Sequence, residues 1–150
     1  MVGNDFRMVR GFITPQIGLA IRLFVVDASP FDDEDQKLKD FKKVFINPEI
    51  VEEKGDKWTF NEGCLSIPKI REDIMRGEAV TMTYYDENFK QFRSTFSGIT
   101  ARVILHEYDH IEGKLFIDYL KPLKRKLLKG KLDDISRGKV SVDYKMVFPK

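Results

Sequence analysis

The stretch SGITARVILHEYDHIEG, residues 97–113, decides the fold because it predicts one helix with a sharply defined start and end. Ser97 is a favourable N-cap residue, and Gly113 is of the type that commonly follows the last helical turn. Two aliphatic side chains and two imidazoles fall on one face of this helix through spacings of four, three and four residues. These residues are Ile99, Val103, His106 and His110.

Residues 106–110 read HEYDH, an HExxH pattern. On a helix this spacing places both imidazoles on one face, where they can bind one metal ion, with Glu107 directly after the first histidine. His106 and His110 are also the only two histidines of the chain. The alternative is a pair of core or surface histidines that share a helical turn without binding a metal.

Two imidazoles need a third ligand to hold an ion tightly. The single cysteine, Cys64, is a better candidate than Asp118, because a thiolate is a strong ligand and a nearby dication favours its charged form. Three protein ligands leave one coordination position open, as in catalytic sites, and the ion would lower the pKa of water there. Glu107 could then take a proton from water and give it to a departing amine. These residues predict metal-assisted hydrolysis of an amide or a similar carbonyl compound.

The rest of the chain reads as strands followed by helices, which predicts a single α+β domain, residues 1–150, with mostly antiparallel sheets packed around the HExxH helix. An apolar run predicts a buried strand over 18–26, and a charged loop or short helix follows over 31–43. A strand is expected to start at 44–46, to be interrupted by Asn47 and Pro48, and to continue over 50–53. A turn at 54–56, which contains Gly55, is expected before another short strand at 58–60. The alternation in 79–85 and the apolar residues of 89–96 predict a hairpin. Further expectations are a short strand or extended link at 116–120, a basic helix after Pro122 and a terminal strand at 144–148.

The formal net charge of +2 gives no strong field that would favour DNA or a membrane. No apolar run is long enough to span a bilayer or to serve as a secretory signal, so a cytoplasmic protein is expected. The one basic cluster runs from Lys121 to Lys131, and its simplest interpretation is a solvated helix face.

Three motifs resemble those of bacterial peptide deformylases: Glu62–Pro68, which reads EGCLSIP, then HEYDH, and the upstream residues 15–18, PQIG. The resemblance implies removal of the formyl group from the formyl-methionine of new polypeptides. It also implies that Cys64, His106 and His110 bind one divalent ion, most often Fe²⁺ with Zn²⁺, Ni²⁺ or Co²⁺ as substitutes, and that Glu107 is the acid and base.

The resemblance assigns further roles along the chain. The side-chain amide of Gln16 and the backbone N–H of Leu65 would stabilise the oxyanion. The formyl-methionyl peptide would bind as an added strand, and five residues are candidates to contact it. Gly11 and Gly63 would bind its backbone, Arg71 would edge the groove, and Ile99 and Val103 would line the methionine pocket, although plain core packing is an equal explanation for each of the last two. The basic segment 121–131 could contact the ribosome through its phosphates.

Residues 9–14 depart from the family pattern. Val9, Ile13 and Thr14 replace smaller residues, and the amino-terminal helix of the family is expected to be missing or altered. A crowded groove would give a weakly active or inactive metal-binding relative. A zinc endopeptidase, which HExxH alone would also suit, is the other alternative.

Overall fold

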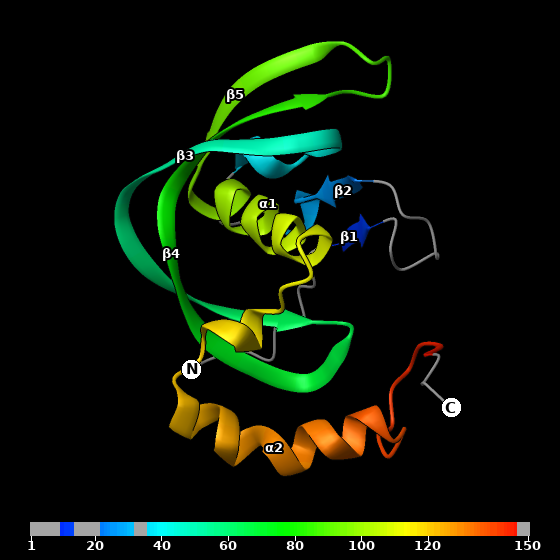
Figure 1. The fold of residues 1–150 in the computed structure, drawn as a ribbon. Coiled ribbons are helices and arrows are strands. Elements are labelled where there is room, and N and C mark those ends of the chain that lie inside the picture. The colour runs from blue at the N-terminus through cyan, green and yellow to red at the C-terminus, as the bar shows by residue number, and fades with distance from the viewer. Residues whose placement is uncertain (1–9, 14–21, 32–35, 147–150) are drawn as a thin grey trace. The chain divides into compact units, whose positions relative to one another are not determined.

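The computed structural model describes residues 10–13, 22–31 and 36–146, shown in Figure 1. The described residues form two compact units. The first comprises residues up to Trp58 together with Met75–Leu115, and the second comprises Thr59–Ile74 together with the residues from Phe116 onward.

Five strands make one sheet among the described residues, in the order β1-β2-β3-β4-β5. The pairs β1/β2, β2/β3 and β4/β5 are antiparallel. The strands are β1 (Arg10–Ile13), β2 (Leu23–Asp27), β3 (Lys42–Cys64), β4 (Ile67–Tyr85) and β5 (Gln91–Ser97). Together with the two helices described below, this sheet confirms the expected α+β class and its antiparallel pairing.

Aromatic side chains form the core of the first unit. Phe24 of β2 stacks on Phe45 of β3 with ring centroids 4.7 Å apart, and Phe45 lies 4.6 Å from Tyr84 of β4. Phe96 of β5 meets Phe45 edge to face at 5.7 Å. The predicted hairpin is therefore present, and it supplies two of these rings.

Helix α1 (Gly98–Ile111) packs against β1, β2 and β5 and carries the HExxH residues (Figure 1). Its buried side chains face several directions around the axis, from Ala101 through Asp109. Ser97 occupies the N-cap position as expected, but its side chain makes no capping hydrogen bond. Gly113 follows the helix with φ at +75°, which confirms it as the residue that ends this element.

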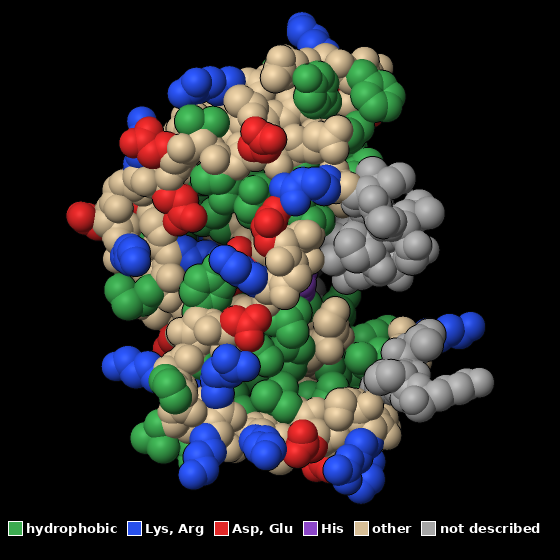
Figure 2. Space-filling view, in the orientation of Figure 1, with side chains coloured by type: hydrophobic (Ala, Val, Ile, Leu, Met, Phe, Trp, Pro, Cys, Tyr) green, Lys and Arg blue, Asp and Glu red, His purple; other side chains and the backbone are tan. Residues whose placement is uncertain are grey.

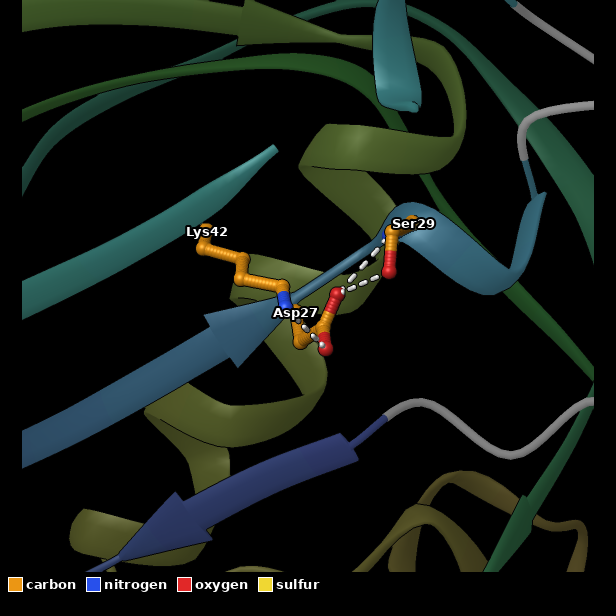
Figure 3. A network of polar contacts seen from close by, with 3 residues as sticks. All are labelled: Asp27, Ser29 and Lys42. Atoms are coloured by element: carbon orange, nitrogen blue, oxygen red, sulfur yellow. Dashed lines mark hydrogen bonds and ion pairs between the residues drawn. The ribbon is translucent and has the colours of Figure 1, made fainter. Parts of the chain in front are cut away.

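A small polar network closes the end of β2 (Figure 3). Asp27 accepts hydrogen bonds from the backbone N–H of Ser29, at 3.0 Å, and from its hydroxyl. Lys42, the register partner of Asp27 on β3, lies 3.7 Å from the same carboxylate. This turn starts the 3-10 helix η2 (Ser29–Phe31); a second one, η3 (Gln36–Leu38), follows, so the expected loop between β2 and β3 includes short helical turns. The part of the predicted first strand before residue 22 lies outside the described residues.

The middle of the sheet differs from the expectation. One continuous strand, β3, replaces the interrupted strand expected over 44–53 and the short strand expected at 58–60, and β4 begins at Ile67 and not at residue 79. The expected turn at Gly55 is wrong because the glycine takes φ +76° within a strand that continues past it. A Cβ there would lie 2.9 Å from Cβ of Glu78, so glycine also permits a close approach to β4. Charged residues lie between the buried Ile70 and Ile74, so the sequence shows no clear alternation there. The first half of β4 was therefore not predicted.

In the second unit, the 3-10 helix η4 (Phe116–Tyr119) occupies the place of the expected short strand or link. Helix α2 (Pro122–Ser136) confirms the predicted basic helix and has Pro122 at its first turn. Residues 144–146 form no strand, and the remainder of the predicted terminal strand lies outside the described residues. Among the described residues, no helix is both long enough and apolar enough to cross a membrane.

Candidate metal centre

The two histidines of α1 point their Nε2 atoms at one another. These atoms are 3.2 Å apart, and the ring centroids are 4.8 Å apart with the ring planes at 80°. His106 is buried and His110 is half-buried, so the pair sits at the edge of the protein interior. Their spacing of four residues on one helix produces this convergence, as predicted.

The geometry of this pair fits a bound cation. Two imidazole nitrogens that bind a tetrahedral ion at about 2.0–2.1 Å lie about 3.3 Å apart. The observed 3.2 Å between the Nε2 atoms of His106 and His110 is close to that value. The two side chains therefore need little rearrangement to share one ion.

Cys64 is the last residue of β3 and is half-buried. Together with His106 and His110 it makes up the group of possible metal ligands found within the described ranges, and the three ligand atoms lie within 4.8 Å of one another. A thiolate and two imidazoles form a donor set that suits several first-row divalent ions. This proximity makes Cys64, His106 and His110 a candidate ligand set, and their role as ligands stays a prediction.

Glu107 is buried, with a relative exposure of 5%. It directly follows His106 on α1. A carboxylate that is held in the interior of a protein has little competition from bulk water for the proton it exchanges. Its position suits the role of acid and base that the sequence assigns to it.

The residues that follow Cys64 are held by the chain's last described segment. The phenol of Tyr144 donates a hydrogen bond of 2.8 Å to the backbone carbonyl of Leu65. Burial, and to a smaller extent the charge of Cys64, raises the pKa of Tyr144, which keeps this phenol protonated as the donor. Leu65 itself is exposed, with a relative exposure of 38%.

Gly63 and Arg71, two predicted substrate contacts, lie together. A Cβ on Gly63 would approach Nη1 of Arg71 to 2.9 Å and its Cγ to 3.1 Å, so a side chain at this position would require Arg71 to shift. Arg71 donates hydrogen bonds of 2.8 Å and 2.7 Å to the side-chain and backbone oxygens of Asn61. The side chain of Asn61 in turn donates to Asp73 at 2.9 Å.

The remaining predicted contacts are placed unevenly. Val103 is 1% exposed and belongs to the core, whereas Ile99 is half-buried. Gly11 lies in β1, opposite Val26 of β2. Gln16 lies outside the described residues, so its predicted role stays a prediction. Of the altered stretch at 9–14, the structure describes only the backbone of residues 10–13, which form β1.

The comparisons with known proteins agree on one family. Residues 7–126 match the model of the family described as "Polypeptide deformylase". The chain is 52% identical over 146 residues to the peptide deformylase of Christiangramia forsetii, an alignment that covers 93% of this chain and 74% of that protein. It is 50% identical over 143 residues to the peptide deformylase of Flavobacterium psychrophilum, with 91% and 74% covered.

Solved structures give the same result. The chain resembles the crystal structure of a peptide deformylase from Legionella pneumophila with a TM-score of 0.70 and 41% sequence identity, over 86% of this chain and 72% of that one. The chain belongs to the polypeptide deformylase family. The predicted family and deformylase function are thereby confirmed, and neither the endopeptidase nor the inactive relative is favoured.

Three polar residues around the centre were missed by sequence reasoning. Arg102 and Asp109 are buried on α1, and Tyr144 reaches the Cys64 segment from the far end of the chain. The spacing of Arg102 and Asp109 was an available signal, because charged residues seven apart on a helix share a face, and charged groups that are buried need partners. Tyr144 carried none, because a hydrogen bond across 79 residues has no local pattern.

Proposed function

We propose that this deformylase binds one divalent ion through Cys64, His106 and His110 and removes the formyl group from formyl-methionyl nascent peptides in the cytoplasm. We expect Fe²⁺, with Zn²⁺, Ni²⁺ or Co²⁺ as possible substitutes, because the donor set accepts several of these ions. The proposal also treats residues 1–150 as one catalytic domain. The observation that carries it is the convergence of two imidazoles and one thiol on a common position.

When bound, the ion would supply Lewis acidity, polarising the formyl carbonyl and making water more acidic. Glu107 would take the proton of the attacking water and pass it to the amine that leaves, so that formate and a free amino terminus are produced. The backbone N–H of Leu65 and the amide of Gln16 would donate hydrogen bonds to the developing oxyanion, each contributing roughly 2.7–4 kcal/mol.

The peptide would bind as an additional strand. Strand β1, which carries Gly11, is the first strand in the sheet order, so one of its edges is free for such pairing among the described strands. Gly63 would also offer backbone groups to the peptide, and Arg71 would edge the peptide groove. Ile99, which is half-buried, is the better candidate for the pocket wall, while Val103 would support it from within the core.

The test measures formate released from a formyl-Met peptide by protein loaded anaerobically with Fe²⁺ or Ni²⁺, together with elemental analysis. Wild type should contain about one ion per chain and should release formate. Cys64→Ser should lose metal, whereas Glu107→Ala should keep the metal and lose activity. Metal-loaded wild type that releases no formate would refute the proposal, and unchanged metal content in Cys64→Ser would remove the thiolate from it.

We also propose that the basic segment 121–131 contacts the ribosome. Helix α2 contains no buried residue, and Lys and Arg side chains gather along it in the space-filling view (Figure 2). Such a row of cations would bind RNA phosphates in a salt-dependent manner. Cosedimentation with ribosomes at low salt should be lost when Lys124, Arg125 and Lys126 are neutralised together.

The matched control neutralises three exposed cations of the first unit: Lys57, Lys90 and Arg93. This variant has the same change in net charge and should still cosediment. Equal loss in both triple variants would show that net charge alone matters, and equal retention would show that the segment makes no contact.

A further inference from the structure

Helix α1 is fixed by two buried polar contacts that the deformylase reaction does not itself require. Arg102 joins the helix to β3, and Asp109 joins it to β4. Both residues belong to the first unit, as do their partners Trp58 and Arg76. One contact therefore lies on each side of His106 along the helix.

Arg102 is only 2% exposed. Its Nη2 donates a hydrogen bond of 2.6 Å to the backbone carbonyl of Trp58, and its guanidinium carbon lies 4.7 Å from the centroid of the Trp58 ring. The planar guanidinium thus stacks on the indole and bonds to the same residue, a combination that lysine cannot reproduce. Because the acceptor is a backbone carbonyl, this hydrogen bond fixes α1 relative to the main chain of β3.

The second contact is a buried ion pair. Nη1 of Arg76 lies 2.6 Å from Oδ2 of Asp109, and the two side chains are 4% and 11% exposed. Burying charges is costly, and apolar residues of similar volume are often at least as stabilising. Bulk stability is therefore a poor explanation for keeping charged groups at both positions, and geometry is a better one.

The spacing shows which motion these contacts restrict. Seven residues separate Arg102 from Asp109, nearly two helical turns, so both lie on one stripe of α1. At about 100° per residue, His106 is roughly 40° from Arg102 around the axis, and His110 is roughly 80° from it. A rotation of α1 would break both contacts and would turn both imidazoles away together.

We propose that Arg102 is a positioning residue, which sets the rotation of α1 and thereby aims Nε2 of His106 and His110 at the metal. The Arg76–Asp109 pair holds the same stripe two turns further on. This inference rests on the proposed role of the two histidines as ligands. It adds that the ligand geometry depends on a guanidinium that touches neither ion nor substrate.

The test uses Co²⁺-loaded protein, because its visible absorption bands report the arrangement of ligands independently of activity. Arg102→Met keeps most of the side-chain volume but removes the donors. It should shift the Co²⁺ bands, weaken Co²⁺ binding by about 10-fold and lower kcat more than it raises KM. Arg102→Lys should be intermediate in all three, because one donor and the charge remain.

Arg93→Met, at an exposed position of β5, is the matched control and should behave as wild type. A folded Arg102→Met with wild-type bands and wild-type Co²⁺ affinity would overturn the inference. Should Arg102→Met fail to fold, Arg102→Lys decides, since unchanged bands in that variant have the same meaning. Imidazole ¹⁵N spectra of the metal-free proteins give a second readout, so the comparison stands even if wild type shows no deformylase activity.

Discussion

The two helices of this protein have nearly equal lengths and opposite environments. Helix α1 has 14 residues with eight buried side chains, whereas α2 has 15 residues and none buried. The polar groups of α1 are held by partners on neighbouring strands. On α2, by contrast, Leu123 and Leu127 are more than 70% exposed. The same secondary structure therefore carries the two candidate ligand histidines in a buried setting in one place and forms an accessible charged surface in the other.

Because α2 buries no side chain, interactions other than core packing must stabilise it. Pro122 favours its first turn, and Lys124 and Arg125 pair with Glu72 and Asp118 at 2.9 Å and 3.5 Å. Such partly exposed pairs contribute about 0–1 kcal/mol each. Substitutions in α1 should thus have large effects and substitutions in α2 small ones.

The largest expected effect is the loss of catalytic activity when Glu107 of α1 is replaced. Glu107→Gln should lower kcat/KM by about 10²–10⁴-fold, because a neutral amide cannot exchange the proton of the attacking water. Metal content should remain as in wild type. Formate release at saturating metal measures the change.

Glu112→Gln, just beyond the end of α1, is the control for Glu107→Gln. Glu112 forms an ion pair with Arg22 at 2.5 Å, a contact that raises the pKa of Arg22, and its side chain is 36% exposed. Its loss should leave kcat/KM within about two-fold of wild type. Similar losses in the two variants would mean that the helix tolerates no charge change, and the specific role of Glu107 would have to be abandoned.

The second prediction concerns packing. Ile104 of α1 is fully buried, and Ile104→Ala should lower the free energy of unfolding by about 2–5 kcal/mol through lost burial and a residual cavity. Leu127→Ala removes a similar side chain from α2 and should change it by less than about 0.5 kcal/mol. Chemical denaturation measures both, and equal losses would show that Leu127 is covered by a partner in solution.

These helices also show how far sequence reasoning reaches. The period of α1, its ends and its two histidines are local features, and the structure confirms them. β3 was predicted as three pieces because turn-forming residues stand where a long strand continues, Gly55 among them. A local sequence pattern shows which backbone conformations a residue can adopt. Whether the chain turns at that residue depends on strand pairing in the folded protein.

The candidate site likewise combines features that the local sequence predicts with contacts that it does not predict. The HExxH spacing and the EGCLSIP motif predicted a candidate ligand set, because each motif is contained within a few consecutive residues. The supports of the site lie far apart in the chain: Arg102 with Trp58 is separated by 44 residues, and Tyr144 with Leu65 by 79. No sequence periodicity predicts contacts between residues so far apart, so only the three-dimensional structure reveals them.

A third prediction compares the two helices through glycine. Gly98 starts α1 with φ at +60°, and Gly130 lies inside α2; a Cβ at either position would meet no atom within 4 Å. Gly98→Ala should destabilise the protein by about 1–2 kcal/mol through the left-handed backbone alone. Gly130→Ala should stabilise α2 by up to about 1 kcal/mol, since alanine is the better helix former. Thermal unfolding should therefore move in opposite directions, and a shift of the same sign in both would contradict this reading of the backbone.

The smallest expected effect tests whether the ion pairs of α2 matter for stability at all. Lys124→Gln should cost no more than about 1 kcal/mol of unfolding free energy, and Glu72→Gln should cost a similar amount, because the lysine is about half exposed while the carboxylate is 13% exposed. The double variant should lose less than the sum of the two if the side chains interact, since the second substitution removes a partner that is already gone. Raising the salt concentration should shrink the difference between wild type and variant. Strict additivity at low salt would show that Lys124 is not engaged by Glu72, which would leave this lysine free to bind a phosphate and would separate the electrostatic function of α2 from its folding.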